Sequence, residues 1–153
     1  MTGGGRAGLV LAIALLGCRS SRPSHPAGDW TIVAHRIPHV SAVTDSAAAA
    51  WHGRTLRFAT GEASFGGTVC TEARYRFRTA PADSLLGVGF RVSRAALGMA
   101  DSVSRLGVTE VTCGREPWTA PGGLLIWVGE DRAYTVWDGV FFELNRTVRL
   151  RAR

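Results

Sequence analysis

Histidines are the side chains of this sequence best suited to metal binding or proton transfer, and three of the four fall in one stretch, at His35, His39 and His52. His35 and His39 are four residues apart, which invites a shared metal ion. Pro38 between them excludes the interior of a helix. On a strand the two rings would stand about 13 Å apart, too far for one ion. His52 adds no recognisable ligand spacing, so we expect surface or rim histidines and predict no metal site.

No group of polar side chains has the spacing of a hydrolase. Ser64 lies in Gly-Glu-Ala-Ser-Phe-Gly at 61–66, which is not the Gly-X-Ser-X-Gly of a nucleophile elbow. Glu130 and Asp131 fall in an expected turn, and Asp138 suits turn geometry. Phosphate loops and dinucleotide fingerprints are also absent from the sequence. We therefore predict a protein that is not an enzyme and needs no cofactor, and keep an unrecognised hydrolase as a third alternative.

The first 18 residues have the layout of a secretory signal. Arg6 is their only charge, and residues 7–16 form an apolar run that is too short to span a bilayer. The run ends in Leu15-Leu16-Gly17-Cys18, which resembles the lipobox of bacterial lipoproteins. The resemblance implies that residues 1–17 are a signal peptide removed by cleavage, and that Cys18 is then acylated to form a stable membrane anchor. The alternative is an ordinary signal peptide with a chance cysteine.

Residues 18–28 predict a flexible tether, because they are polar, contain proline and have no periodicity. Arg19 stands where an inner-membrane retention aspartate would follow the lipidated cysteine. We therefore expect a location in the cell envelope, facing the periplasm, and at the outer membrane if the cell has two.

The charge of the chain predicts no nucleic-acid partner. All 18 basic residues are arginines, and the net charge is +6. They are scattered along the chain, except near the C-terminal end, where residues 147–153 form a basic tail. The clustered arginines are Arg146, Arg149, Arg151 and Arg153.

Cys70 and Cys113 remain once Cys18 is acylated, which also accounts for the odd number of three cysteines. Both lie in strand-like segments of a chain that folds outside the cytoplasm, so we predict a disulfide between them. It would close a loop of about 43 residues and contribute about 3–4 kcal/mol in the chain-entropy model. The alternative, two free or metal-binding thiols, has no Cys-X-X-Cys spacing to support it.

These residues must be positioned by β-structure, because short apolar alternations recur between turn signals. Residues 55–59 and 73–79 alternate as half-buried strands do, the latter with Tyr75 and Phe77 on one face and arginines on the other. Residues 124–128 are apolar throughout, which predicts a strand covered on both faces. Asp138-Gly139 predicts a hairpin. Further strands are expected at 30–34, 63–65, 89–92, 108–113, 133–137 and 140–144.

One short helix is expected after the first strand. Thr44 is its candidate N-cap, residues 45–50 favour helix, Gly53 can end it, and Trp51 would pin it to the sheet. Residues 93–98 are a candidate for one more helical turn. About eight or nine strands within residues 29–146, without a βαβ rhythm, predict one mostly β domain, a small antiparallel up-and-down barrel.

Two family resemblances bear on this domain. Gly28-Asp29-Trp30 at the start of the first strand resembles the Gly-X-Trp signature of lipocalins. That resemblance implies an eight-stranded barrel in which Trp30 plugs one end and a late arginine, here Arg146, packs over it. A shorter stretch, from Leu56-Arg57-Phe58 through Gly67-Thr68-Val69-Cys70 to Tyr75, is similar to the opening of META-type envelope lipoprotein domains.

Five tryptophans are many for this length, and some must fill the interior of a barrel. A small eight-stranded barrel is either packed solid or holds one small ligand. Two functions therefore stay open for a membrane-anchored, lipocalin-like protein. One is binding of a small apolar ligand. The other is a protein-interaction module, an inhibitor or envelope assembly factor, whose partner meets an exposed loop such as residues 114–123 with Trp118.

Overall fold

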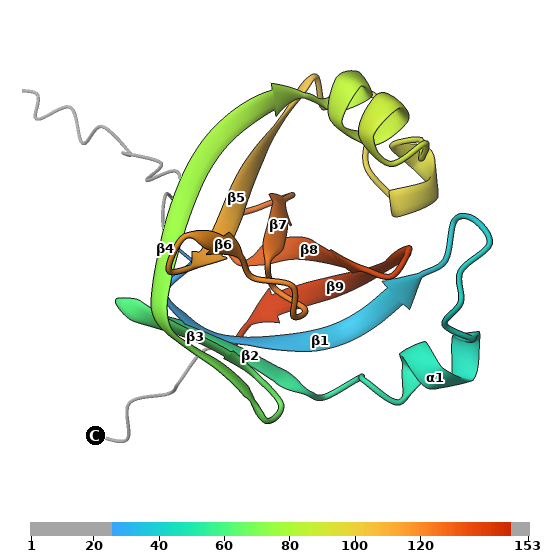
Figure 1. The fold of residues 1–153 in the computed structure, drawn as a ribbon. Coiled ribbons are helices and arrows are strands. Elements are labelled where there is room, and N and C mark those ends of the chain that lie inside the picture. Colours follow the sequence, from blue (N-terminus) through green and yellow to red (C-terminus); the bar gives the residue numbers. More distant parts are fainter. Residues whose placement is uncertain (1–25, 148–153) are drawn as a thin grey trace, which may run out of the picture.

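Nine strands form one antiparallel sheet in residues 26–147, the part of the chain that the computed structural model describes (Figure 1). Each strand pairs with the strands that precede and follow it in the chain, apart from the two-residue β6 at the edge of β5. Pairing of β4 with β5, and of β1 with β9, joins the other eight into a ring. The strands are β1 (Gly28–Arg36), β2 (Thr55–Ala59), β3 (Gly61–Phe65), β4 (Thr68–Pro81), β5 (Arg105–Cys113), β6 (Glu116–Pro117), β7 (Leu124–Trp127), β8 (Arg132–Trp137) and β9 (Val140–Arg146).

The prediction of a mostly β, antiparallel fold is therefore confirmed. The two strands with the clearest alternation are found where the sequence places them. In β2, Leu56 and Phe58 are buried and their neighbours face out. In β4, the arginines at 74, 76 and 78 are exposed, and Tyr75 and Phe77 pack against the core.

Turn chemistry closes the hairpins. Asp138 and Gly139 both adopt positive φ, at 50° and 79°, as the central residues of a type I′ turn must. They join β8 to β9, whose register runs from Trp137↔Val140 to Arg132↔Asn145. The predicted Asp138-Gly139 hairpin is confirmed.

The predicted short helix is also present, as α1 (Asp45–Ala49). The Thr44 hydroxyl accepts a hydrogen bond from the backbone N–H of Ala47 at 3.2 Å, which satisfies one of the free amides of the first turn. After α1, the Trp51 ring stacks on Phe142 with their centroids 4.6 Å apart. The helix therefore places Trp51 against the end of the ring.

A second apolar layer lies outside the ring. Two helical segments between β4 and β5, η1 (Ser84–Gly89) and η2 (Ala95–Leu97), cover the outer face of β7–β9 and of the first part of β5, at Leu106 and Val108 (Figure 1). Leu86 and Leu97 pack there against outward residues of the sheet such as Ile126 and Phe141. This cover explains the uniformly apolar β7, because Leu125 and Trp127 face the interior while Ile126 faces the helices.

The expected strand at 89–92 is wrong. Gly89 is the last residue of η1, a single π-helical turn, Phe90 caps it, and Arg91 adopts a positive φ of 55°. Leu85, Leu86 and Val92 are buried beneath the segment. Burial of these side chains against β7–β9 stabilises the helical turn, and the local sequence does not contain that information.

Candidate functional site

Side chains fill the interior of the ring, where a lipocalin-like protein would hold a ligand. A series of aromatic contacts runs through it. Trp30 meets Trp127 edge-on at 5.4 Å, and Phe58 meets Tyr75 at 6.1 Å and Trp118 at 6.4 Å between ring centroids. Two buried threonines satisfy polar groups among them, since Thr109 accepts from Trp127 Nε1 at 2.9 Å and Thr135 from the Gly122 N–H at 2.8 Å.

One end of the ring carries Trp30 and Arg146, which are register partners on β1 and β9. Trp30 is 1% exposed, and its indole N–H donates to the Pro26 carbonyl at 2.7 Å. The Arg146 guanidinium lies over the Trp30 ring, with Cζ 4.4 Å from the centroid. Arg146 also donates to Asp131 at 2.8 Å and to the Ala27 carbonyl. Arg146 therefore connects the start of β1 to β9, the last strand.

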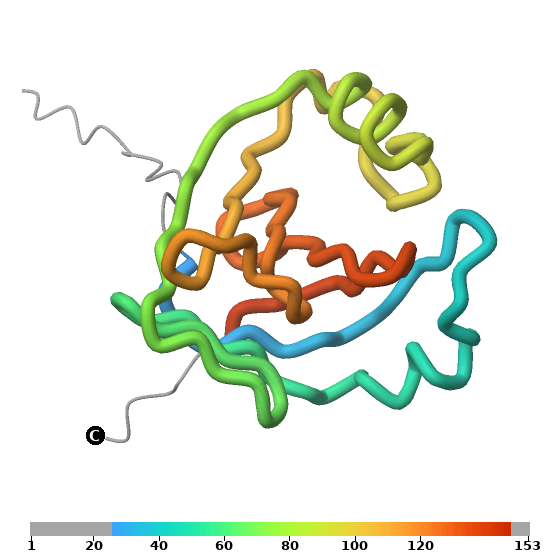
Figure 2. Tube along the Cα trace, viewed as in Figure 1, coloured from blue at the N-terminus to red at the C-terminus, as the bar shows by residue number. Residues whose placement is uncertain are grey.

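The other end is covered by residues 114–123, which cross the opening of the ring (Figure 2). Trp118 is only 7% exposed and belongs to the interior cluster. Gly122 permits this close packing, because a Cβ there would lie 2.8 Å from the Leu56 side chain and 3.0 Å from Phe58. The expectation that Trp118 stands exposed on a binding loop is wrong, since this loop folds inward and acts as a plug.

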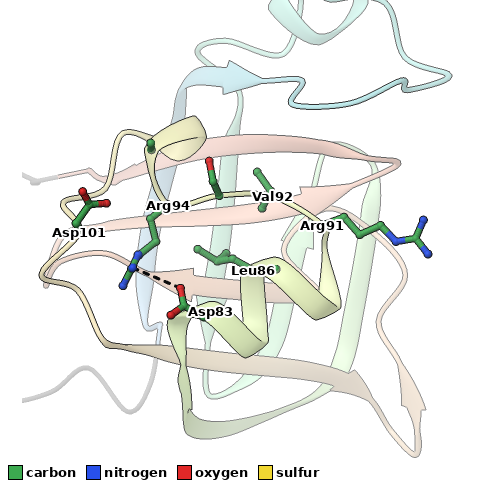
Figure 3. A pocket seen from close by; sticks show the side chains of 9 residues that line it. Asp83, Leu86, Arg91, Val92, Arg94 and Asp101 are labelled. Atoms are coloured by element: carbon green, nitrogen blue, oxygen red, sulfur yellow. Dashed lines mark ion pairs between the residues drawn. The ribbon is translucent and has the colours of Figure 1, made fainter.

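Hollows formed by the described residues include three at the surface of the ring. The hollow in Figure 3 has a volume of about 530 Å³ and is lined largely by the segment from Asp83 to Ala95. Its polar groups do not converge. Arg94 pairs with Asp83 at 3.5 Å, whereas Arg91 points away from that pair (Figure 3). Two further hollows, of about 300 and 460 Å³, lie beside Met99 and beside the backbone of residues 117–120.

The predicted disulfide is confirmed. Cys70 on β4 and Cys113 on β5 are bonded, with their Cα atoms 5.6 Å apart. Cys113 is the register partner of Ala73, at the place where β4 ends its pairing with β3 and begins its pairing with β5. The bond therefore fixes the closure of the ring at that point.

Two histidines and an aspartate form a row of hydrogen-bonded side chains that the sequence does not predict. His35 Nδ1 lies 2.9 Å from His52 Nε2, and His35 Nε2 lies 2.9 Å from an oxygen of Asp45. His35 therefore links β1 to the first residue of α1 and to the turn that follows α1. His39 is elsewhere, bonded to the Arg91 carbonyl. In residues 26–147 no cluster of His, Cys, Asp and Glu could hold a metal ion.

The outer face of β4 and β5 carries a line of charge. Glu110 accepts from Arg76 at 2.6 Å and from Arg78 at 3.0 Å. The hydrogen bond from Arg76, helped by Arg78, holds the pKa of Glu110 below its usual value. One carboxylate thus serves two guanidinium groups, and Arg74 follows on the same face. This face therefore has an excess of positive charge.

Tyr75 lies on the opposite face of β4 from these arginines and packs against the core. Its hydroxyl lies 3.0 Å from the Ala59 carbonyl and 2.5 Å from the Glu62 carbonyl, so it bonds the turn between β2 and β3. Burial raises the pKa of Tyr75 to about 12. The phenol therefore remains a hydrogen-bond donor to this turn well above neutral pH.

Comparison of the chain with protein-family models, with curated proteins and with solved structures finds no match. No helix in residues 26–147 is long and apolar enough to cross a membrane. Cys18 and the segments 1–25 and 148–153 lie outside the described residues. On the outer face of β4 and β5, Arg74, Arg76 and Arg78 follow one another, and the guanidinium groups of Arg76 and Arg78 share the carboxylate of Glu110.

Proposed function

We propose that this protein is an envelope lipoprotein, anchored through acylated Cys18, whose ring of strands is a lipocalin-like barrel that binds a protein partner on its outer surface. The filled interior is the observation that carries the choice between the two expected functions. Trp30, Phe58, Phe142 and Leu144 are each at most 2% exposed and occupy the volume that an enclosed apolar ligand would need. A partner must then meet the protein from outside.

Several observations support the lipocalin-like part of the proposal. The strands follow one another around the ring, and the first pairs with the last. Trp30 opens β1 with Arg146 over its ring. A cation over the face of a tryptophan is a favourable contact, and it lies at the end where that resemblance expects it.

The anchor is supported by the sequence Leu15-Leu16-Gly17-Cys18. Gly28, the first residue of β1, lies ten positions after Cys18 in the sequence. If residues 18–28 form the flexible tether that the sequence predicts, its root-mean-square span would be about 16–19 Å. This distance keeps the domain close to the membrane and leaves most of its outer surface accessible.

The anchor is tested by labelling cells with an alkyne analogue of palmitate. The wild-type chain should take up label and fractionate with membranes. The variant Cys18→Ser should lose the label and remain as the precursor or in the soluble fraction. Label retained by the Cys18→Ser variant would refute the proposed anchor.

The filled interior is tested by titrating the protein with an environment-sensitive apolar dye. Wild type should show no saturable binding. Phe58→Ala, which removes a 1% exposed ring from the centre of the aromatic series, should create a dry cavity and gain binding. A one-to-one complex of the dye with wild type, displaced by a fatty acid, would favour the enclosed ligand over the outer surface.

A further inference from the structure

Within residues 26–147, the long strand β4 has an edge that no other strand pairs with along part of its length. It pairs with β3 only from Thr68 to Ala73, whereas its pairing with β5 continues from Ala73 to Pro81. Among residues 26–147, no strand therefore pairs with residues 76–80 along the edge that faces away from β5. This edge begins just past the turn to which the Tyr75 hydroxyl is hydrogen-bonded. In Figure 1 this part of β4 curves up the side of the ring towards the helical segments.

The hydrogen bonds at the two ends of the β4–β5 ladder show which amides face this edge. The Ala82 N–H donates to Ser104, and the Gly114 N–H donates to Glu72. Bonded pairs alternate along an antiparallel ladder, so the amides of residues 76, 78 and 80 face β5. The amides of Phe77 and Thr79 face the open side, where an added strand would find them.

Charge surrounds the same edge. Arg76 and Arg78 project from the outer face with side chains 76% and 43% exposed, and share Glu110. Arg105 reaches the inner side of the edge, where it donates to the Thr79 hydroxyl at 3.0 Å. Three guanidinium groups and one carboxylate leave two positive charges along five residues. Half-buried Phe77 lies between them on the inner face.

We propose that this edge binds an extended acidic segment of a partner protein, which adds to β4 as a further strand. Side chains of such a strand alternate between faces. Its carboxylates would lie on the outer face, within cross-strand reach of Arg76 and Arg78, and the apolar residue between them would cover Phe77. The partner segment is thus an acidic–apolar–acidic stretch, recognised by backbone hydrogen bonds and by charge.

This inference rests on the proposed function, because it names the surface through which the anchored domain would act. Edge arginines can also serve only to keep strands of other molecules away. The two roles make opposite predictions for an acidic peptide. A strand-adding site binds it, and a guarded edge does not.

The binding test uses the mature chain and a fluorescein-labelled peptide, Thr-Glu-Val-Glu-Val-Glu-Thr, followed by anisotropy at increasing salt. We expect saturable binding that weakens with salt and is absent for the same peptide with Lys in place of Glu. The double variant Arg76→Gln/Arg78→Gln should bind about tenfold more weakly, the scale of two ion pairs. The matched control Arg57→Gln/Arg115→Gln removes equal charge from exposed positions elsewhere and should bind as wild type does.

Two measurements separate strand addition from simple charge attraction. A peptide N-methylated at alternate residues, and the variant Thr79→Pro, should each abolish saturable binding, while circular dichroism shows that Thr79→Pro remains folded. In hydrogen exchange, the Phe77 and Thr79 amides should exchange faster than those of Arg76 and Arg78, and should become protected when the peptide binds. Protection of Phe77 and Thr79 in the free protein, binding unaffected by N-methylation, or no binding at all would each overturn the inference.

The outcomes also distinguish this inference from the proposed function. If the peptide does not bind, while Cys18 takes up label and the dye does not bind the interior, only the proposed β4 site is refuted. If the chain takes up no label but still binds the peptide, the proposed anchor is refuted and the proposed β4 site stands.

Discussion

The contact between Trp30 and Arg146 is the most direct energetic test of the way this ring is closed. Trp30→Ala should lower the free energy of unfolding by about 3–5 kcal/mol, because the ring is 1% exposed and its removal leaves a cavity beside Trp127. Arg146→Ala should cost less. It removes one cation–π contact, about 0.5–2 kcal/mol, and a partly exposed ion pair with Asp131, at most about 1 kcal/mol.

The informative quantity is the coupling between the two substitutions. The double variant should lose about 0.5–2 kcal/mol less than the sum of the single losses, since both remove the same contact. Urea denaturation followed by circular dichroism measures all four proteins with the disulfide intact. Asp131→Ala serves as the control, because it removes the ion pair of Arg146 and leaves the ring contact, so it should couple to Trp30→Ala weakly. Additive losses for Trp30 and Arg146 would refute this account of the ring end.

Three further predictions follow from the β4 and β5 strands. Reduction of the disulfide, or Cys70→Ala with Cys113→Ala, should lower stability by about 2–5 kcal/mol, and the native oxidised domain should show no thiol that reacts with Ellman's reagent. Tyr75 should ionise near pH 12 in an ultraviolet titration. Its contribution to stability is therefore complete below about pH 10 and is lost as the pH rises through the pKa of the folded state. Tyr75→Phe should abolish this loss of stability at high pH. Glu110→Gln should destabilise the domain by at most about 1 kcal/mol at pH 7. Because the pKa of Glu110 is lowered on folding, the difference from wild type should shrink as the pH falls below about 4.5.

The strands could be predicted where their pattern is local. β2 coincides with the expected 55–59, because alternation of Leu56 and Phe58 with polar residues specifies one buried face without reference to the rest of the chain. The apolar β7 was expected to be covered on both faces, and it is. The identity of the second cover was not predictable. η1 depends on contacts of Leu85 and Leu86 with strands that lie more than twenty residues further along the chain.

The inward fold of residues 114–123 was missed for a related reason. Arg115, Glu116 and Pro117 are typical of a solvated loop, and they are indeed exposed. The burial of Trp118 depends instead on Gly122, which has no side chain where Leu56 and Phe58 need the space. A glycine near a tryptophan in a loop is a weak signal, because its meaning depends on a strand some sixty residues earlier.

The row of two histidines and an aspartate shows the same limit at a candidate site. The close spacing of His35 and His39 drew attention to the wrong pair, because β1 ends at Arg36 and the chain turns away before His39. His52 and Asp45 reach His35 because α1 brings the connection between β1 and β2 back against β1. The N-cap residue Thr44 predicts the helix. It does not predict that the helix returns the segment between β1 and β2 to the side of β1.

The second apolar layer restricts where a partner can bind. η1 and η2 cover the outer face of β7–β9 and of the first part of β5, so an added strand or a docked surface cannot reach these parts from outside. Both ends of the ring are also occupied, by Trp30 with Arg146 and by the inward loop at Trp118. Within residues 26–147, the outer face of β1–β4 and the adjoining part of β5 lie outside this cover, and there β4 combines an edge that no described strand pairs with and exposed arginines. We therefore expect the proposed partner, if it binds the strands rather than a loop, to bind at the edge of β4.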